Sequence, residues 1–505
     1  MHRKKPMFYS AVLLTLVNLI LRLVGTGFQV YLSGRIGAAG IGLLQLLLSV
    51  GSLSMIAAMA GIRTATMYLT SAELGSGHPE RVGSILTRCS IYSLLCSGCA
   101  SILLFLSAPR IAHMWIGQSD CAPALRLFAL FLPVSCLCGV FTGYFTSAGR
   151  IGALAAVEVA EQLLCMAVTV GALGLWAGTD TLRACQSVIF GSGVGACLTL
   201  ACLFTLRCRE KAPGSGWRLP ARRLLDAAAP LALADDLKAG ISTLENLMVP
   251  RRLSLYPGTA DPLALFGTVC GMVFPVMMFP AALLFGLAEL LIPELARCRA
   301  AGSERRIRYL SRRSLKVSML YGMCVWGFLF LFGQPLCRRL YGSEEAGALL
   351  RLFSFLVPML YCDAITDAMT KGLGQQKICV RYNILTSGLD VLFLFFLLPR
   401  WGMRGYIVSF AVTHILNFIL SLRLLLKITR QRLSPRTPLL TILSAGLSAA
   451  LCIPCGTLWL RAVCFPAAFI SLLVLLRVLD GEDLQWLRGL LLGKKQEPPV
   501  SRQLL

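Results

Sequence analysis

Long apolar runs of about 20 residues recur along the chain, separated by short polar segments. A helix of this length spans the hydrocarbon core of a bilayer, which is roughly 30 Å thick. The pattern predicts fourteen membrane-spanning helices, near residues 7–32, 40–68, 85–107, 122–148, 151–177, 183–206, 226–250, 262–296, 314–334, 346–371, 378–398, 403–426, 437–457 and 461–479. The run at 262–296 is too long for one straight crossing, and Pro275, Pro280 and Pro293 predict a kink or a tilt. The predicted fold class is an all-α integral membrane protein.

Composition supports a membrane protein over a soluble one. The 505 residues are 56% hydrophobic and 14% charged, and the mean hydropathy is +0.73, whereas soluble domains are about 45–50% apolar and about 25% charged. The first run follows MHRKKP, as in a signal peptide, but its apolar core is too long and no small-residue cleavage site follows it cleanly. We therefore expect a retained first helix.

The net charge of +24 is concentrated in a few loops. Besides the HRKK start, the basic clusters are Arg207, Arg209, Lys211, Arg218, Arg222 and Arg223; Arg297, Arg299, Arg305, Arg306, Arg308, Arg312 and Arg313; Lys427, Arg430, Arg432 and Arg436; and Lys494 and Lys495. Fourteen spans put all of them on one side, which predicts a cell-membrane protein with cytoplasmic N- and C-termini. Arg251, Arg252, Arg338 and Arg339 fall on the other side, so the bias is not absolute. The pattern indicates anionic lipid headgroups, and not nucleic acid, as partners.

Most of the twenty cysteines lie inside the predicted spans. Cys96 with Cys99, and Cys452 with Cys455, have the CxxC spacing of metal or redox sites. Within apolar helices, small polarizable side chains of this kind more often serve helix packing. We predict no metal site and no cofactor.

An internal repeat divides the chain. LRLFALFLPV at 125–134 recurs as LRLFSFLVPM at 350–359, and the same offset of 225 pairs Gly117 with Gly342 and Gly149 with Gly374. Six spans per repeat predict two parallel six-helix lobes with a substrate path between them, a known transporter architecture. The predicted domains are 1–210, 211–430 and an appended pair of spans with the tail at 431–505.

The repeat pairs the first predicted span with the seventh, and both carry polar groups. In the first span Asn18, Arg22 and Gln29 share one helix face, at spacings of four and seven. In the seventh, APLALADDLKAGISTLENLMVP places Asp235, Lys238, Ser242 and Glu245 on one face, with Asp236 beside it.

A charge at the centre of a membrane helix costs about 2.5–3.5 kcal/mol on insertion scales. Exposure of the Asp235 face to lipid is therefore disfavoured. Two interpretations stay open: a structural ion-pair network between helices, and the wall of an aqueous cavity. Weaker candidates for the same cavity are Arg63, Glu158, Glu161, Glu289, Asp363 and Asp367. His414 is more typical of a packed polar residue than of a proton relay, and snorkelling to the headgroups also explains Arg63.

Four segments resemble the stage V sporulation protein B group, which belongs with the lipid II and polysaccharide flippases of the MATE-like (MOP) superfamily. They are RIGAAGIGLLQLLLSVGSLSMIAAMAGI at 35–62, GTVCGMVFPVMMFPAALLFGLAELLIPELA at 267–296, TKGLGQQKICVRYNILTSGLDV at 370–391 and WGMRGY at 401–406. The resemblance covers roughly residues 10–430. It implies fourteen helices, two six-helix lobes and a central cavity that opens alternately to the two faces.

The resemblance also implies that the first, second, seventh and eighth helices line the cavity, where cationic side chains bind the diphosphate of an undecaprenyl-linked sugar. Arg22, in LRLVG, matches the arginine of the R-x-x-G motif in the first helix. The chain departs from the pattern at Phe28, where a basic residue is common, at Arg63, where the family has a proline, and at Tyr68, where it has a lysine.

The expected function is a flippase for a lipid-linked sugar of peptidoglycan or polysaccharide synthesis, with a role in spore cortex formation. It would act as a monomer, coupled to H⁺, Na⁺ or the membrane potential. A MATE-type exporter of cationic drugs is the alternative that the acids of the seventh span suit. A membrane glycosyltransferase or ligase would need a larger extramembrane domain, since the loops here reach only about 20 residues and are mainly basic. The charges within the spans disfavour a non-transporting scaffold.

Overall fold

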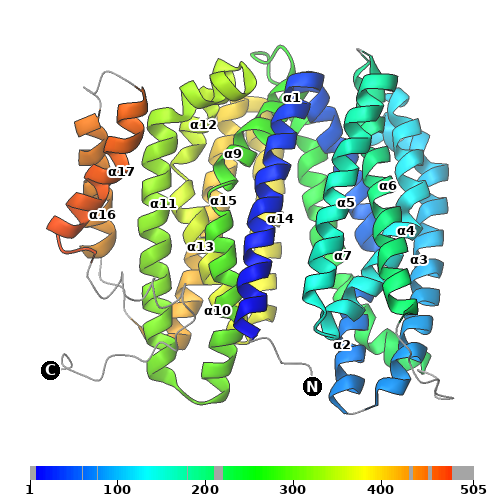
Figure 1. Cartoon of the computed structure of the whole chain (residues 1–505). Helices are drawn as coiled ribbons and strands as arrows, with labels where there is room; N and C mark the ends of the chain where they lie inside the picture. Colours follow the sequence, from blue (N-terminus) through cyan, green and yellow to red (C-terminus); the bar gives the residue numbers. More distant parts are fainter. Residues whose placement is uncertain are drawn as a thin grey trace. The chain divides into compact units, whose positions relative to one another are not determined.

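The computed structural model describes residues 7–59, 61–76, 78–178, 180–209, 220–431, 436–452 and 458–479. These residues form helices and no strands, so the predicted all-α fold class is confirmed (Figure 1). The first half of the chain contains α1 (Met7–Met59), α2 (Ile62–Gly75), η1 (Pro79–Arg81), α3 (Val82–Ile111), η2 (Ala112–Ile116), η3 (Ser119–Cys121), α4 (Ala122–Ser147), α5 (Ile151–Ala172), η4 (Leu173–Ala177), α6 (Thr181–Cys208) and α7 (Ala221–Leu253). The second half contains α8 (Pro262–Thr268), η5 (Val269–Val273), α9 (Phe274–Met278), α10 (Ala282–Ala300), α11 (Glu304–Tyr341), α12 (Glu344–Ser354), α13 (Val357–Gly372), α14 (Gln376–Trp401), α15 (Met403–Thr429), α16 (Arg436–Cys452) and α17 (Leu458–Leu475).

Among the described residues, eight helices are long and apolar enough to cross a membrane, or ten if each bent pair is one span. One candidate, Ile20–Leu74, has 55 residues, a helical length of about 80 Å and hence more than twice the bilayer core. Its backbone leaves the helical conformation at Gly37 (φ 71°, ψ 175°), a conformation that glycine adopts readily. The predicted count of fourteen stays a prediction.

The helices form two compact units. Unit 1 comprises Met1–Gly271 with Leu394–Gly402, and unit 2 comprises Met272–Phe393 with Met403–Leu505. The seventh predicted span, now α7, and the short helix α8 therefore group with the first six spans. The division into lobes at 1–210 and 211–430 remains a prediction.

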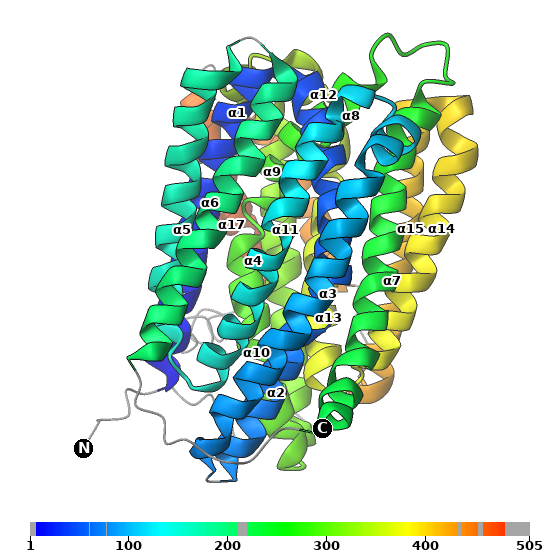
Figure 2. The same cartoon turned by 90° about the vertical axis from the view of Figure 1, so that its right-hand side faces the viewer.

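Unit 1 is built from long helices packed side by side. The helix α3 packs on α4, α4 on α6, and α5 on α6 (Figure 2). Apolar side chains such as Ile85, Val140 and Phe145 fill the core between α2, α3 and α4. The helix α8 lies very close to α1, because a Cβ at Gly267 would overlap the carbonyl oxygen of Ala38.

Unit 2 is organised around the 38-residue helix α11. The helices α12 and α13 pack against α11, as do α16 and α17, drawn in orange and red in Figure 1. Leu320 and Met323 of α11 form a core with Ala445 of α16 and Phe469 of α17. The predicted kink at 262–296 is present: Pro262–Met278 and Ala282–Ala300 are bent by 63°.

The repeat is visible in the backbone. Gly117 and Gly342 end corresponding helices with φ of 85° and 64°, and Gly149 and Gly374 do so with φ of 70° and 72°. The repeated proline has two outcomes, since Pro133 lies within the continuous helix α4 and Pro358 follows a 57° bend between α12 and α13. The two copies of the repeat thus share the glycine turns at their helix ends, whereas the helices between these turns differ in shape.

Candidate functional site

The helix α7 packs on the second half of α1 within unit 1. It carries the ionisable residues of the seventh predicted span, Asp235, Asp236, Lys238 and Glu245. The Thr243 Oγ1 donates a hydrogen bond to the Ser49 carbonyl oxygen at 3.1 Å, and the Asn246 Nδ2 donates to the Ser49 Oγ at 3.0 Å. Ala239 and Leu247 are buried on the same side of the helix. These contacts fix which face of α7 is turned toward α1.

The polar face of α7 that was predicted from the sequence, with Lys238, Ser242 and Glu245, lies beside the face that packs on α1. Lys238 and Ser242 are exposed and Glu245 is half-buried. Asp236 is half-buried and lies within electrostatic range of the Tyr92 hydroxyl on α3. The side chain of Asp235 lies outside the described residues. Of this face, Lys238 and Ser242 are therefore not packed against the described part of the chain.

The polar residues predicted on the first span occupy the first half of α1. Arg22 is exposed and Gln29 is half-buried, while the side chain of Asn18 lies outside the described residues. The Thr26 Oγ1 donates to the Arg22 carbonyl oxygen at 2.9 Å, a bond within the helix. Arg22 therefore carries a cationic group on the surface of a long apolar helix.

The weaker candidates of unit 1 form a group between α2, α5 and α6. Arg63 is exposed, and Glu158 is half-buried with Arg63 and Glu161 in electrostatic range. The Thr199 Oγ1 donates to the Glu161 carboxylate at 2.6 Å. Glu161 thus has a fixed polar partner.

In unit 2, a buried carboxylate of α14 faces α15. Asp390 is 9% exposed, and its Oδ1 accepts hydrogen bonds from the Ser409 Oγ at 2.6 Å and the Thr413 Oγ1 at 3.1 Å. Among the described residues, no ion pair joins Asp390 to a Lys or Arg, and His414 lies within electrostatic range of it.

The predicted candidates Asp363 and Asp367 lie on α13 near this group. The Asn417 Nδ2 donates to the Asp363 Oδ2 at 3.0 Å, and the Thr386 Oγ1 donates to the Asn417 Oδ1 at 3.5 Å. The Asp363 Oδ1 is buried without a hydrogen-bond partner in the described structure. Asp367 instead forms an ion pair with Lys371 at 2.6 Å. Asp363 and Asp390 therefore share one polar region of unit 2 through Asn417, Thr386 and α15.

This region, Asp363, Thr386, Asp390, Ser409, Thr413 and Asn417, is called the α13–α15 polar cluster below. A buried carboxylate without a counter-charge is costly in a low-dielectric interior. Carboxylate and hydroxyl oxygens are ligands for a hard cation or a proton. Within the described chain, no three His, Cys, Asp or Glu side chains gather at one point.

Glu289, the remaining predicted candidate, is exposed on α10. No described hydrogen bond or ion pair joins it to the cluster. The structure therefore does not bring Glu289 together with the acids of α13 and α14.

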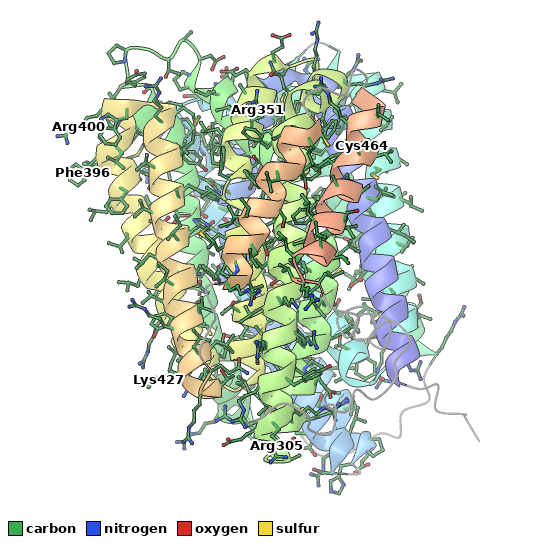
Figure 3. The ribbon with its side chains drawn as sticks, turned by 90° about the vertical axis from the view of Figure 1, so that its left-hand side faces the viewer. Arg305, Arg351, Phe396, Arg400, Lys427 and Cys464 are labelled. Atoms are coloured by element: carbon green, nitrogen blue, oxygen red, sulfur yellow. The ribbon has the colours of Figure 1, made fainter. Side chains whose placement is uncertain are left out.

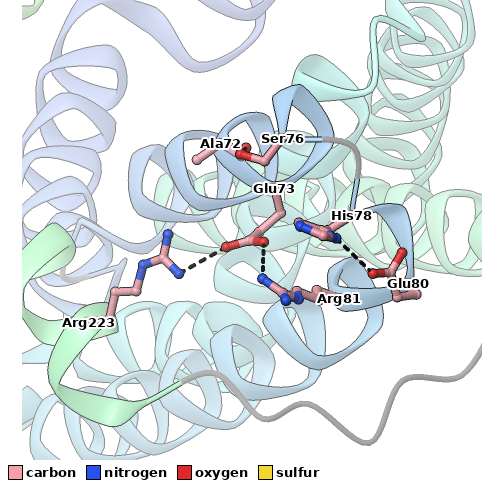
Figure 4. Close-up of polar contacts among 7 residues, drawn as sticks. All are labelled: Ala72, Glu73, Ser76, His78, Glu80, Arg81 and Arg223. Carbon is pink, nitrogen blue, oxygen red and sulfur yellow. Dashed lines mark hydrogen bonds and ion pairs between the residues drawn. The ribbon is translucent and has the colours of Figure 1, made fainter.

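A second buried carboxylate lies at one end of unit 1 (Figure 4). Glu73 of α2 forms ion pairs with Arg81 of η1 at 3.2 Å and with Arg223 of α7 at 2.9 Å. Its side chain is 6% exposed, against 32% and 46% for the two arginines. Glu73 could not be predicted from the sequence, because nothing in the local pattern separates it from a solvated helix end.

The distribution of charge in unit 2 is uneven. Figure 3 shows Arg305 and Lys427 projecting from the end where α11 begins and α15 ends, with Arg351 near the opposite end. The Gln431 Nε2 donates to the Arg308 carbonyl oxygen at 2.6 Å, which joins these two helix ends. The basic clusters of the two segments thus lie at one end of unit 2.

The α13–α15 polar cluster was mostly missed from the sequence, although a signal was present. Ser409, Thr413, Asn417 and Ser421 recur every four residues in α15 and are all buried. Such small polar residues on one helix face mark a helix contact in a membrane protein. Combined with the single acid Asp390 in an apolar run, this stripe would have located the cluster.

Known proteins are similar to this chain in sequence and in fold. Residues 6–170 match the family model described as MatE. Stage V sporulation protein B of Bacillus subtilis (strain 168) is 20% identical over 419 residues, which cover 80% of each chain. The resemblance identified from the sequence is confirmed.

Solved structures agree with this similarity. The lipid II flippase MurJ, in an inward closed conformation, superposes with a TM-score of 0.69 at 11% identity, over 92% of this chain and 99% of that one. A multidrug resistance MATE family transporter of the MOP superfamily, in an inward-facing conformation, gives 0.66 at 14% identity, over 83% and 100%. The fold of this multi-span membrane protein is therefore the one that MATE transporters and MurJ share.

Proposed function

We propose that this chain, which has the fold of the MATE-like transporters, is a flippase that moves an undecaprenyl-diphosphate-linked sugar across the cytoplasmic membrane. The observation that carries the proposal is the exposure of Arg22 on α1 and Lys238 on α7. Exposed cationic side chains on long apolar helices are suited to bind an anionic headgroup, and a diphosphate provides two adjacent anionic groups. The similarity to a sporulation protein and to a lipid II flippase supports a lipid-linked substrate.

The mechanism follows from the requirements of such a substrate. A diphosphate sugar is too polar to enter the hydrocarbon core, so it needs a polar path, while its polyprenyl tail is soluble in the bilayer. We assign Arg22 and Lys238 to the diphosphate, with Asn18, Gln29, Asp235, Asp236 and Glu245 as flanking groups. The arrangement supports transport and no bond-breaking chemistry, because the substrate needs only to be held and then released.

The orientation is part of the proposal. The end of unit 2 that carries Arg305 and Lys427 (Figure 3) would face the cytoplasm by the positive-inside rule. Both termini would then be cytoplasmic. Substituted-cysteine labelling at the loop after α11 and at the loop between α10 and α11 would establish the two sides.

Coupling is assigned to the α13–α15 polar cluster. Asp390 is buried among hydroxyl groups, so its charge is balanced when a proton or Na⁺ binds. Binding of such a cation changes the net charge of a buried group, and a conformational equilibrium of the transporter responds to that change. The choice between H⁺ and Na⁺ is an outcome of the transport assay.

The central test uses purified protein in liposomes that contain fluorescent undecaprenyl-diphosphate sugars. Arg22→Ala should lower the rate of transbilayer movement at least tenfold, because the anionic headgroup loses a charged partner. The matched control is Arg126→Ala, which removes an exposed arginine that lies 5.2 Å over the Phe105 ring on other helices of unit 1. Equal movement in wild type and Arg22→Ala would contradict the assigned role.

A MATE-type exporter of cationic drugs is the second candidate. The observation that favours it is the pair of acids in unit 2, the buried Asp390 and the half-buried Asp363, together with the similarity to a multidrug MATE transporter. Cells that express the chain would then extrude an ethidium-like dye, and Asp390→Asn would abolish the extrusion. Dye efflux without movement of the lipid-linked sugar would favour this candidate.

A further inference from the structure

We propose that Tyr361 and Tyr321 are positioning residues that hold the break between α9 and α10 by supplying hydrogen bonds in place of helix backbone. The proposal deepens the transport function, since α10 belongs to the eighth predicted span. Its first test is independent of any substrate.

The break removes regular backbone hydrogen bonds within a predicted span. The chain leaves the helix at Phe279–Ala281, between α9 and α10. Pro280 has no N–H to donate, and its ring is incompatible with a straight helix. The Pro280 carbonyl oxygen accepts a long turn bond from the Leu283 N–H at 3.4 Å in place of a regular helical bond. Carbonyl oxygens that lose their helical partner in a membrane must be satisfied from within the protein.

Two tyrosine hydroxyls meet this requirement. The Tyr361 Oη donates to the Met277 carbonyl oxygen at 2.8 Å, and the Ala281 N–H faces the same hydroxyl. The Tyr361 hydroxyl thus stands between a donor and an acceptor that would pair directly in a continuous helix. The Tyr321 Oη donates to the Pro280 carbonyl oxygen at 2.8 Å.

The neighbouring helices fix both tyrosines. The two rings stack with centroids 6.0 Å apart and planes inclined by 20°, and Tyr361 is 1% exposed. Beside Tyr321, Gly322 approaches α13 so closely that a Cβ would lie 2.8 Å from the Pro358 Cα. This contact between α11 and α13 sets the distance of both hydroxyls from the break.

The geometry has a consequence for α10. The Met277 and Pro280 carbonyl oxygens are engaged by tyrosines, so the break is a built bend rather than an open ligand site. The bend sets the direction in which α10 continues, and with it the position of Glu289 two turns later. The tyrosines therefore act on any ligand through the course of α10 and not by contact.

The test measures backbone hydrogen exchange of the purified full chain in detergent micelles, without substrate. Tyr361→Phe should speed exchange of peptides that cover 277–285 by roughly tenfold, since one hydrogen bond at a buried carbonyl is lost. Tyr321→Phe should have a smaller effect in the same direction. The matched control is Tyr341→Phe, because the Tyr341 hydroxyl is buried without a hydrogen-bond partner among the described residues.

Unchanged exchange at 277–285 in both variants would overturn the proposal. It would also be overturned if the control Tyr341→Phe changed exchange as much as the test variants, over the whole chain. If Tyr361→Phe does not fold, Tyr321→Phe decides the question. In the flipping assay, Tyr361→Phe should lower the maximal rate about fivefold while the half-saturating substrate concentration changes by less than about twofold. If wild type moves no lipid-linked sugar, the proposed function fails and the exchange result still stands.

Discussion

Two buried carboxylates in this chain have opposite surroundings. Glu73 of α2, at one end of unit 1, is 4% exposed as a whole residue, and its carboxylate contacts two arginines (Figure 4). Asp390 of α14, in unit 2, is 9% exposed and contacts two hydroxyl groups. The cost of burying the carboxylate charge is therefore offset by fixed cations at Glu73 and by neutral hydrogen-bond donors at Asp390.

The difference separates a structural acid from a candidate coupling acid. A carboxylate paired with arginines keeps its charge balanced in every state that keeps the pairs, so it has no need of a mobile ion. A carboxylate among hydroxyls is stabilised by hydrogen bonds, but its net charge remains unless a cation binds. Burial alone does not indicate function, whereas the identity of the partners does.

The largest expected effect is at Asp390. Asp390→Asn keeps the shape and can still accept both hydroxyl bonds, but it removes the charge that a cation would balance. We expect cation-dependent transport to fall by about a hundredfold, while the melting temperature stays the same or rises. Transport in liposomes under imposed H⁺ and Na⁺ gradients measures the first quantity, and thermal unfolding in micelles measures the second. Full transport with unchanged ion dependence would assign Asp390 to structure.

Glu73 should behave in the opposite way. Glu73→Ala leaves Arg81 and Arg223 without their shared acid and opens space at a buried position. The expected loss in the free energy of unfolding is about 1–3 kcal/mol, reduced by the partial exposure of both arginines. The ion dependence of transport should not change. Glu80→Ala is the matched control, because Glu80 lies nearby in η1 and its ion pair, with His78 at 3.2 Å, is partly exposed to solvent.

The fold could be predicted from the sequence to a large extent, because the bilayer restricts what an apolar run can become. Runs of about 20 apolar residues must form helices to satisfy their backbone, and the long run is bent at Pro280 as expected, whereas Pro275 and Pro293 lie within α9 and α10. The grouping of α7 with unit 1 was not expected. It depends on Thr243 and Asn246 reaching Ser49, a contact between residues nearly 200 positions apart that no local pattern contains.

The candidate site was harder to predict for the same reason. Lys238 and Asp363 could be predicted as candidates from the sequence, because charges inside apolar runs are rare and costly. Ser409 and Thr413 are common in membrane helices, and only their distance from Asp390 gives them meaning. Tyr361 could not be selected from the sequence either, because a tyrosine in a membrane helix is not distinctive. Its role follows from its hydrogen bond to the Met277 carbonyl oxygen.

A smaller effect is expected from the hydroxyls around Asp390. Ser409→Ala removes the shorter of the two hydrogen bonds to the carboxylate, at 2.6 Å. The cation concentration for half-maximal transport should rise about tenfold, since a hydrogen bond to a charged group is lost. Ser421→Ala is the matched control, because Ser421 is buried on the same stripe of α15 and makes no described contact with Asp390. Equal effects of the two changes would mean that the stripe serves only helix packing.

The smallest expected effect is at Arg223. Arg223→Ala removes one of two partners of Glu73, and the side chain is 46% exposed, so solvent already screens the pair. The free energy of unfolding should fall by less than about 1 kcal/mol, and the difference should shrink in high salt. Arg222→Ala, at the exposed neighbouring position of α7, should have no effect. If Arg223→Ala lowers the free energy of unfolding as much as Glu73→Ala does, the ion pair with Arg223, and not the burial of Glu73, stabilises the packing of α7 on α2. The main role of Glu73 would then be to connect these two helices.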